Sequence, residues 1–429
     1  MMKRKCLVAM ALASTMVMGT AAYAAEDVTI VLYNYMSETP KQIGLENVEK
    51  AFAETQPDYN ITWDNKGYNQ SDYFTQLQTA FASGDTVDLM MGNPSLYPDL
   101  IDQGFVEDLT GNEFVESLNL SETDLGDASY NGTLYAVPID FKSWGVYYNT
   151  KIFEENGLEV PKTLDEMIHV CDVLKENGIE PYVFAYADAV ELDCEVKNAV
   201  LQAALKNGDN DIFEKLCNGE MKIQDYPYYK EILEAFAKNT LNYITEDALS
   251  TNQQGALEKF VAGKGAMVVL GTWMTADLEA MIEGTDFSYD IFAKPFDNDG
   301  EEPMLTSMVD QCFMINSMSK HKDLVEAFLK FWATEGAEAW SATAGAPLLS
   351  ATTTEGLMGA VKTLAELKAE GKTIPMGAFT TSWTSQFTTI YRKHLVAYAE
   401  SYAKGEPITA DQCLENMQAE FDQVLAENK

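Results

Sequence analysis

The stretch NGTLYAVPIDFKSWGVYYN, residues 131–149, decides how this chain is organised. It opens with an Asn-Gly pair, and because both residues tolerate positive φ, a turn is expected there. A short strand is expected over 134–137, and Pro138 interrupts its pairing because proline has no amide hydrogen to donate. A second apolar run ends at Asn149. Two strands therefore flank a short segment of different character.

That segment carries Asp140, Lys142, Ser143 and Trp144. A chain crossing with exposed polar groups and a large aromatic ring is what a hinge beside a ligand cleft requires. Asp140 and Lys142 are therefore both candidates to bond a ligand hydroxyl. The alternative is that they form a salt bridge with each other or with a neighbour.

Upstream, the apolar runs 28–33, 59–63 and 87–91 alternate with segments whose apolar residues recur at helical spacing. This alternation predicts an α/β fold with a parallel sheet and right-handed crossovers. Ligands on such sheets bind outside the carboxyl ends of the strands. Candidate ligand contacts therefore follow the first and third runs, at Tyr35, Ser37 and Asn93.

Four segments resemble motifs of the family 1 extracellular solute-binding proteins of ABC transporters, the sugar-binding group that includes maltose-binding protein. They are the hinge stretch continued through TKIFEENGLEVPKTLDEM, and then FASGDTVDLMMGN, YPDLIDQGFVEDLT and FVAGKGAMVVLGTWMTADLEAM. The chain departs from the family pattern at Thr133, Val87, Thr150 and Leu164. We expect the departures at Thr133, Thr150 and Leu164 to lie outside the pocket.

The resemblance implies a two-lobed periplasmic-binding-protein-like fold with hinge crossings and a cleft between the lobes. It places 25–139 and 293–318 in the N-terminal lobe, and 140–292 and 319–429 in the C-terminal lobe. It also implies a monomer that captures a carbohydrate, such as an oligosaccharide, and delivers it to a membrane-embedded ABC permease. No catalytic residue, cofactor or metal is implied.

The resemblance also indicates where ligand-binding side chains lie. Trp273 and Trp383 fall on positions where relatives stack an aromatic ring on a sugar, and flat rings suit the apolar faces of sugars. Tyr186 and Asp188 follow a strand whose end points into the cleft in relatives. Asp310 precedes a strand expected over 312–316 and is a further candidate.

The N-terminus has the pattern of a cleavable secretory signal over residues 1–24. Three basic residues precede an apolar segment at 7–18, and Ala-Tyr-Ala at 22–24 fits a cleavage site. We therefore expect a mature chain that starts near Ala25 and works in the periplasm or at the cell exterior. Cys6 precedes the apolar segment, so it cannot serve as a lipid-attachment cysteine.

Composition restricts the partners and the chemistry. The formal net charge of −38 disfavours nucleic acid and anionic membranes. Neither GxSxG nor HExxH occurs, and three histidines are too few and too scattered for a zinc site. The cysteines after the signal are expected to be buried thiols, with one bridge between Cys194 and Cys217 left open. Rival functions are a carrier of a polyamine, peptide or phosphodiester, and a secreted glycan-acting enzyme.

Overall fold

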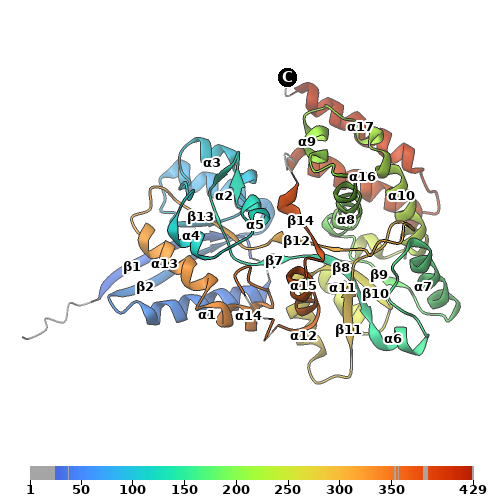
Figure 1. Ribbon diagram of the computed structural model, residues 1–429, viewed down its shortest axis with the longest axis horizontal. Coiled ribbons are helices and arrows are strands. Elements are labelled where there is room, and N and C mark those ends of the chain that lie inside the picture. Colours follow the sequence, from blue (N-terminus) through green and yellow to red (C-terminus); the bar gives the residue numbers. More distant parts are fainter. Residues whose placement is uncertain (1–24, 37, 352–353, 356, 380–384, 428–429) are drawn as a thin grey trace, which may run out of the picture.

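The computed structural model describes residues 25–427 apart from 37, 352–353, 356 and 380–384. Two lobes lie side by side and are joined by crossing strands (Figure 1). The expected signal segment, Ser37 and Trp383 lie outside the described residues. Within the described part, no helix combines the length and the apolarity needed to cross a membrane.

The first lobe is built on a five-stranded sheet of order β2-β1-β3-β13-β6. Its strands are β1 (Glu26–Asn34), β2 (Tyr59–Gly67), β3 (Leu89–Met91), β6 (Val137–Pro138) and β13 (Cys312–Ile315). Strand β1 pairs in parallel with β2 and with β3, whereas β13 runs antiparallel to both of its neighbours. The parallel arrangement of the first three strands confirms the prediction. Pro138 is tolerated because β6 is an edge strand.

Seven α-helices and one short 3-10 helix accompany this sheet in the described residues. They are α1 (Thr39–Thr55), α2 (Gln70–Ser83), η1 (Pro94–Leu96), α3 (Pro98–Asp102), α4 (Glu113–Ser117), α5 (Glu122–Asp127), α13 (Lys322–Ala333) and α14 (Ala337–Ala344). A small hairpin, β4 (Ser129–Tyr130) and β5 (Thr133–Leu134), precedes the hinge. Local signals set the helix ends: the Asn69 side chain accepts the Asp72 N–H at the start of α2, and Gly84 ends it at φ 76°.

The second lobe has a four-stranded sheet of order β11-β8-β10-β9. Its strands are β8 (Trp144–Asn149), β9 (Tyr182–Val183), β10 (Met267–Gly271) and β11 (Tyr289–Phe292). Its α-helices are α6 (Thr150–Glu155), α7 (Leu164–Glu176), α8 (Ala189–Asn207), α9 (Ile212–Cys217), α10 (Pro227–Asn239), α11 (Gln253–Val261), α12 (Thr275–Ile282), α15 (Gly359–Ala369), α16 (Ser385–Ala403) and α17 (Ala410–Glu427). Its 3-10 turns are η2 (Ile223–Asp225), η3 (Leu241–Tyr243), η4 (Ala248–Ser250), η5 (Thr272–Met274) and η6 (Met376–Ala378).

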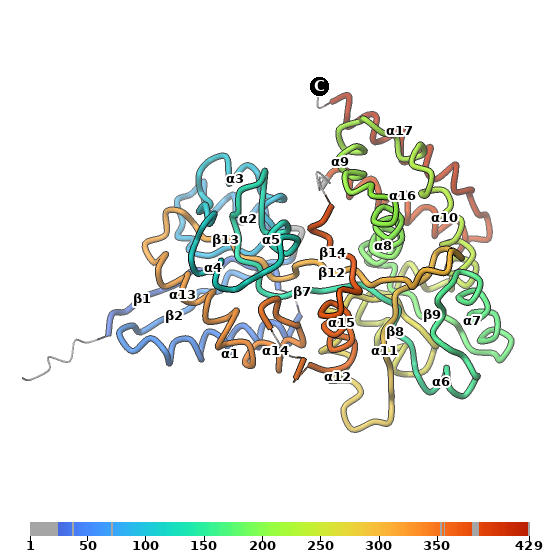
Figure 2. The backbone as a smooth tube through the Cα atoms, viewed as in Figure 1, coloured from blue at the N-terminus to red at the C-terminus, as the bar shows by residue number. Residues whose placement is uncertain are grey.

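A three-stranded sheet of order β14-β12-β7 lies between the lobes, as the backbone trace in Figure 2 shows. It consists of β7 (Phe141–Lys142), β12 (Leu305–Val309) and β14 (Thr373–Pro375). Strand β7 continues directly into the second lobe, and β12 returns toward the first. The sequence stretch 131–149 thus does carry a crossing. Strand β12 was not predicted.

The lobes divide the chain differently from the expected boundaries. Helices α13 and α14 pack in the core of the first lobe, not in the second lobe where 319–429 was placed. Phe328 and Trp332 of α13 contact rings of that core, with centroids 5.4 Å from Phe52 and 5.0 Å from Phe313 respectively. Conversely, Phe296, Met304 and Leu305, which were expected in the first lobe, pack with the core of the second lobe.

The close approach of α14 to α1 explains part of this difference. A Cβ atom at Gly44 of α1 would lie 3.0 Å from a ring carbon of Trp340, so a glycine permits the contact. Trp340 is fully buried there. The segment after β13 therefore stays in the first lobe for two more helices before the chain crosses again.

The lobes also touch backbone to backbone on one side of the hinge. A Cβ atom at Gly377 of η6 would lie only 1.8 Å from the Thr123 carbonyl oxygen of α5, and one at Gly126 would lie 2.9 Å from the Gly377 carbonyl oxygen. Beside this contact, Lys368 of α15 pairs with Asp124 at 2.9 Å. Glycine at both positions allows α5 and η6 to meet this closely.

Cys171, Cys194, Cys312 and Cys413 are buried free thiols. The bridge from Cys194 to Cys217, which the sequence left open, is therefore not formed.

Candidate functional site

An ion-pair cluster lies where the strands cross between the lobes. The Lys142 Nζ atom of β7 lies 2.5 Å from Oδ1 of Asp310, which follows β12. The Lys41 Nζ atom of α1 lies 2.6 Å from Oδ2 of the same carboxylate. Asp310 thus joins a first-lobe helix to a hinge strand, and Lys142 pairs with a neighbour rather than with Asp140.

Charge balance fixes the protonation states in this cluster. Burial alone would raise the pKa of Asp310, but the two lysines outweigh burial and hold it well below its usual range. Burial alone would lower the pKa of Lys41, but Asp310 and Glu38 raise it above its ordinary value. Lys41 is 3% exposed and Asp310 is 7% exposed, so both charges depend on the pairing.

Asp140 has a different role from the one considered in the sequence. It is fully buried, and its oxygens accept the Gln311 N–H at 2.7 Å and the Trp340 indole N–H at 3.0 Å. Burial and the nearby Asp310 raise the pKa of Asp140 to about 7. Asp140 therefore braces the hinge against α14 and presents no free oxygen to a ligand.

Two tryptophans lie beside the ion pairs on the second lobe. The rings of Trp144 and Trp273 meet edge to face, with centroids 5.3 Å apart and planes at 84°. The Lys142 Nζ atom lies 5.2 Å from the centroid of the Trp273 ring, within range of a cation–π contact. Trp273 is half-buried.

Gln253 links Trp273 to buried acidic groups, and sequence reasoning missed it. Its Oε1 atom accepts the Trp273 indole N–H at 3.1 Å, and its Nε2 donates to Oε1 of Glu191 at 2.7 Å. Its backbone N–H donates to Asp188 Oδ2 at 3.2 Å. The only local signal is its position as the first residue of α11, after the capping Asn252. A glutamine there is common enough that it carried no functional meaning by itself.

A cavity of about 320 Å³ opens beside this network. Both lobes line it: the first lobe contributes the start of α1, and the second contributes the starts of α8, α11 and α12. The lining residues are Glu38, Thr39, Asp188, Asn252, Gln253, Gln254, Met274 and Asp277. Glu38 and Asp277 line the cavity from opposite lobes, and burial and then the charge of Glu38 raise the pKa of Asp277. Of these eight residues only Asp188 was predicted from the sequence.

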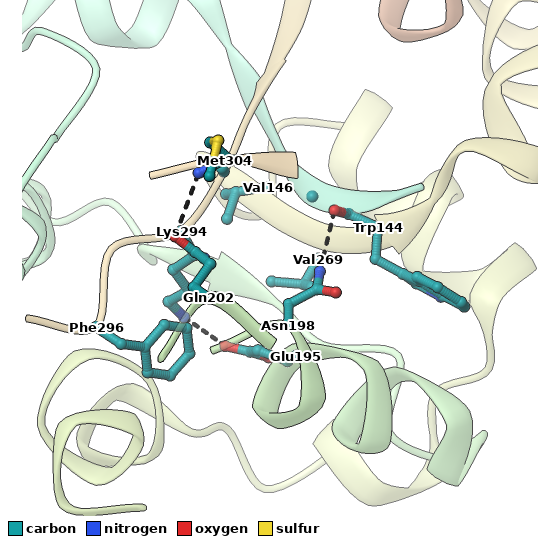
Figure 3. A pocket seen from close by; sticks show the side chains of 11 residues that line it. Trp144, Val146, Glu195, Asn198, Gln202, Val269, Lys294, Phe296 and Met304 are labelled. Carbon is teal, nitrogen blue, oxygen red and sulfur yellow. Dashed lines mark hydrogen bonds and ion pairs between the residues drawn. The ribbon is translucent and has the colours of Figure 1, made fainter. Parts of the chain in front are cut away.

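A second cavity lies inside the second lobe and is much smaller, about 20 Å³. Figure 3 shows Lys294 reaching Glu195 beneath it, while the Trp144 ring points away from both. The Lys294–Glu195 ion pair is 2.5 Å long and almost fully buried. A space of this size holds about one water molecule. It cannot hold a sugar, so the cavity between the lobes is the candidate site.

The predicted site residues therefore fall into groups. Lys142, Trp144, Asp188, Trp273 and Asp310 are linked through direct contacts or through Gln253. Two more lie on the first lobe: Tyr35 packs edge-on against Tyr73 at 5.0 Å, and the Asn93 amide donates to the Asp127 carbonyl at 3.3 Å.

Tyr186 does not join this group. It is buried in the second-lobe core, where its hydroxyl donates to Glu195 at 2.9 Å.

Residues 37–339 match the sequence family described as bacterial extracellular solute-binding protein. The chain belongs to this family. The family segment includes the hinge strands β7 and β12 and every residue that lines the cavity between the lobes.

Relatives of this solute-binding protein support the assignment. It is 24% identical to the multiple sugar-binding protein of Streptococcus mutans, over 73% of each chain. It is 29% identical to an uncharacterized ABC transporter extracellular-binding protein of Pyrococcus horikoshii, over 49% of this chain and 45% of that protein, so that match spans less than half of the relative. The solved structure of the solute-binding protein RafE with raffinose matches at a TM-score of 0.71 and 20% identity, covering 92% of this chain and 99% of RafE. The two-lobed α/β fold is thereby confirmed.

Proposed function

We propose that this solute-binding protein captures an oligosaccharide between its lobes, outside the cytoplasm, and delivers it to an ABC permease. The observation that carries the proposal is the cavity of about 320 Å³ that both lobes line, with Trp273 held beside it by Gln253. The sugar-binding relative and the RafE–raffinose structure support the same ligand class.

The chemistry of the site suits a sugar. A sugar presents apolar C–H faces, which the Trp273 ring can cover, and a rim of hydroxyls. The carboxylates of the cavity can accept hydrogen bonds from these hydroxyls, and its side-chain amides can both accept and donate them. Micromolar binding requires about −8 kcal/mol. A ring contact supplies about 0.5–1.5 kcal/mol beyond its buried area, and charge-assisted hydrogen bonds supply more.

Lobe closure would couple binding to delivery. Periplasmic binding proteins are a standing example of hinge closure around a ligand. A ligand that touches both lobes binds the closed state more tightly than the open one, and this difference is what shifts the population. Glu38 and Thr39 on one lobe, and Asp277 on the other, are placed to make that difference. No bond is made or broken in this cycle.

The proposal includes the export of the chain. Residues 1–24 act as a signal that is removed, and the mature protein works as a monomer. N-terminal sequencing of the exported protein tests the cleavage, with Ala25 as the expected first residue. Light scattering of that protein tests the monomer.

A polyamine carrier is the second candidate, because three carboxylates line the cavity. Thermal melting of the chain from Ala25 with neutral oligosaccharides, spermidine and putrescine separates the two. Ligand at 100 times its Kd adds about 2.7 kcal/mol, which raises Tm by a few degrees. A shift with one oligosaccharide, lost in Trp273→Ala, supports the sugar. A shift with a polyamine alone contradicts it.

A further inference from the structure

We infer that the cavity between the lobes accepts glycans without acidic groups and rejects uronic, sulfated and sialylated ones. This inference rests on the proposed carbohydrate function and concerns the charge of the ligand. It goes beyond the relatives, because a match to sugar-binding proteins does not fix the charge of the sugar.

The first observation is the charge of the cavity wall. Glu38 comes from one lobe, and Asp188 and Asp277 from the other, so carboxylates face the cavity from both sides. No lysine or arginine is among the described residues that line it. An acidic group placed between these walls meets like charge whichever lobe it approaches.

The second observation is that the nearest cations are already paired. Lys41 and Lys142 both bind the carboxylate of Asp310, at 2.6 Å and 2.5 Å. Lys41 also lies 3.7 Å from Glu38 and is 3% exposed. A ligand anion could reach Lys142 only in competition with Asp310, whose charge Lys41 requires. The lysines of the hinge therefore hold the hinge together and are not free to receive an anion.

The third observation is a buried carboxyl group behind the wall. Glu191 is fully buried, and one of its oxygens holds the Gln253 side chain while the other has no hydrogen-bond partner among the described residues. On the wall itself, the side chains of Glu38, Asp188 and Asp277 offer carboxylate acceptors. A ligand rich in hydroxyl donors satisfies such a wall, whereas a carboxylate or sulfate brings only more acceptors.

Four helices begin at the cavity, and their N-termini carry partial positive charge. The acidic residues of the protein already occupy these helix starts: Asp188 lies at the start of α8 and accepts the first backbone N–H of α11, and Glu38 lies at the start of α1. The N-termini of α1, α8 and α11 therefore already have carboxylates of the protein beside them. An acidic ligand would have to displace these carboxylates.

The geometry also gives the wall a part in closure. Glu38 and Asp277 face each other from opposite lobes, so closing an empty cleft brings like charges together. A sugar whose hydroxyls donate to both carboxylates offsets this electrostatic repulsion and joins the lobes. A uronate in the same place would increase the repulsion.

The experiment is titration calorimetry at low salt on the chain from Ala25. The neutral probes are raffinose, maltotriose, galactotriose and chitotriose, and the acidic probes are trigalacturonate and 3′-sialyllactose. We expect at least one neutral probe to bind, with every acidic probe at least tenfold weaker. The double variant Glu38→Gln, Asp277→Asn should reduce the ratio of neutral-probe affinity to acidic-probe affinity at least fivefold. The control Asp286→Asn removes a fully exposed carboxylate of the lobe that carries Asp277, and it should leave this affinity ratio unchanged.

An acidic probe that binds as tightly as the neutral ones, or more tightly, overturns the inference and leaves the carbohydrate function standing. The inference is also overturned if the double variant leaves the ratio of neutral-probe to acidic-probe affinity unchanged. If the double variant fails to fold, 0.5 M NaCl replaces it, because salt screens the like-charge repulsion and should reduce this ratio in the unmodified protein. Binding of none of the probes contradicts the carbohydrate function itself, and the inference falls with it.

Discussion

Lys142 and Asp310, 168 residues apart in the sequence, form an ion pair of 2.5 Å across the two strands that connect the lobes. The same carboxylate holds Lys41 of α1. One side chain therefore fixes two hinge strands and a first-lobe helix at a single point.

Removing the Asp310 charge should destabilise the protein strongly. Asp310→Asn leaves the buried, charged Lys41 with Glu38, 3.7 Å away, as its nearest acidic partner, and breaking a buried pair costs about 3–5 kcal/mol. Urea denaturation followed by circular dichroism measures the change. The control is Asp286→Asn, which breaks the exposed pair with Lys151 and should show no measurable change. Equal stability of the two variants would show that the cluster does not hold the hinge.

Truncating Trp273 should weaken sugar binding with little effect on folding. Trp273→Ala removes the ring that Gln253 and Lys142 hold at the cavity edge, and we expect a loss of about 1–2 kcal/mol in affinity, or roughly 5–30-fold. Calorimetry with the glycan identified by melting measures it. Trp273→Phe keeps an aromatic face and should retain most of the affinity. Unchanged binding in Trp273→Ala would show that the sugar does not stack on Trp273.

Adding one methyl group at Gly377 should disturb the contact between the lobes. The new Cβ would overlap the Thr123 carbonyl, 1.8 Å away, so α5 and η6 must separate. Overpacking of this kind costs about 1–3 kcal/mol. We expect a lower Tm and a larger radius of gyration in X-ray scattering. Gly67→Ala is the control, because the nearest atom to its added Cβ is 3.9 Å away. A Gly377→Ala protein with native dimensions would contradict the assigned contact.

Stability should rise as the pH falls from 8 toward 5. Burial raises the pKa of Glu49 to about 7, against an ordinary value of 4.5, although the Asn65 side chain partly opposes the shift. The folded state therefore binds this proton more tightly than the unfolded state. Its contribution is fully present below the unfolded pKa and is lost as the pH rises through about 7.

Glu49→Gln isolates this contribution, because Gln does not titrate. The free energy of unfolding of the native protein should lose up to about 1.4 kcal/mol per pH unit relative to the variant between pH 5 and 7. Burial also raises the pKa of Asp127 to about 7, so both proteins keep a residual slope. Parallel pH profiles would refute the assignment to Glu49.

The first lobe could be predicted from the sequence because its signals are local. Runs of buried apolar residues alternate with helical periodicity, and the parallel pairing of β1 with β2 and β3 follows from that pattern. The placement of α13 and α14 could not be predicted in this way. Their apolar stripes show that they are buried, but which lobe they cover depends on contacts such as Gly44 with Trp340, 296 residues away in the chain.

The site was predicted in part for a similar reason. Trp144, Trp273, Lys142 and Asp310 are conspicuous, since tryptophan at a strand end or charge at a crossing is unusual. Glu38, Gln253 and Asp277 are ordinary residues in a chain with 67 acidic side chains. Only the folded arrangement, which brings the starts of four helices to one cavity, distinguishes them from the rest.

The contact of Gly126 with Gly377 would give an opening motion of the proposed binding cycle a fixed pivot. In Figure 1, α5 and β14 lie above the crossing strands, whereas α14 and α12 lie below them. A rotation that keeps the two glycines in contact moves the upper edge little and the lower edge much more, because displacement grows with distance from the pivot. A permease that senses whether this protein is loaded would therefore gain most by gripping the edge formed by α14 and α12.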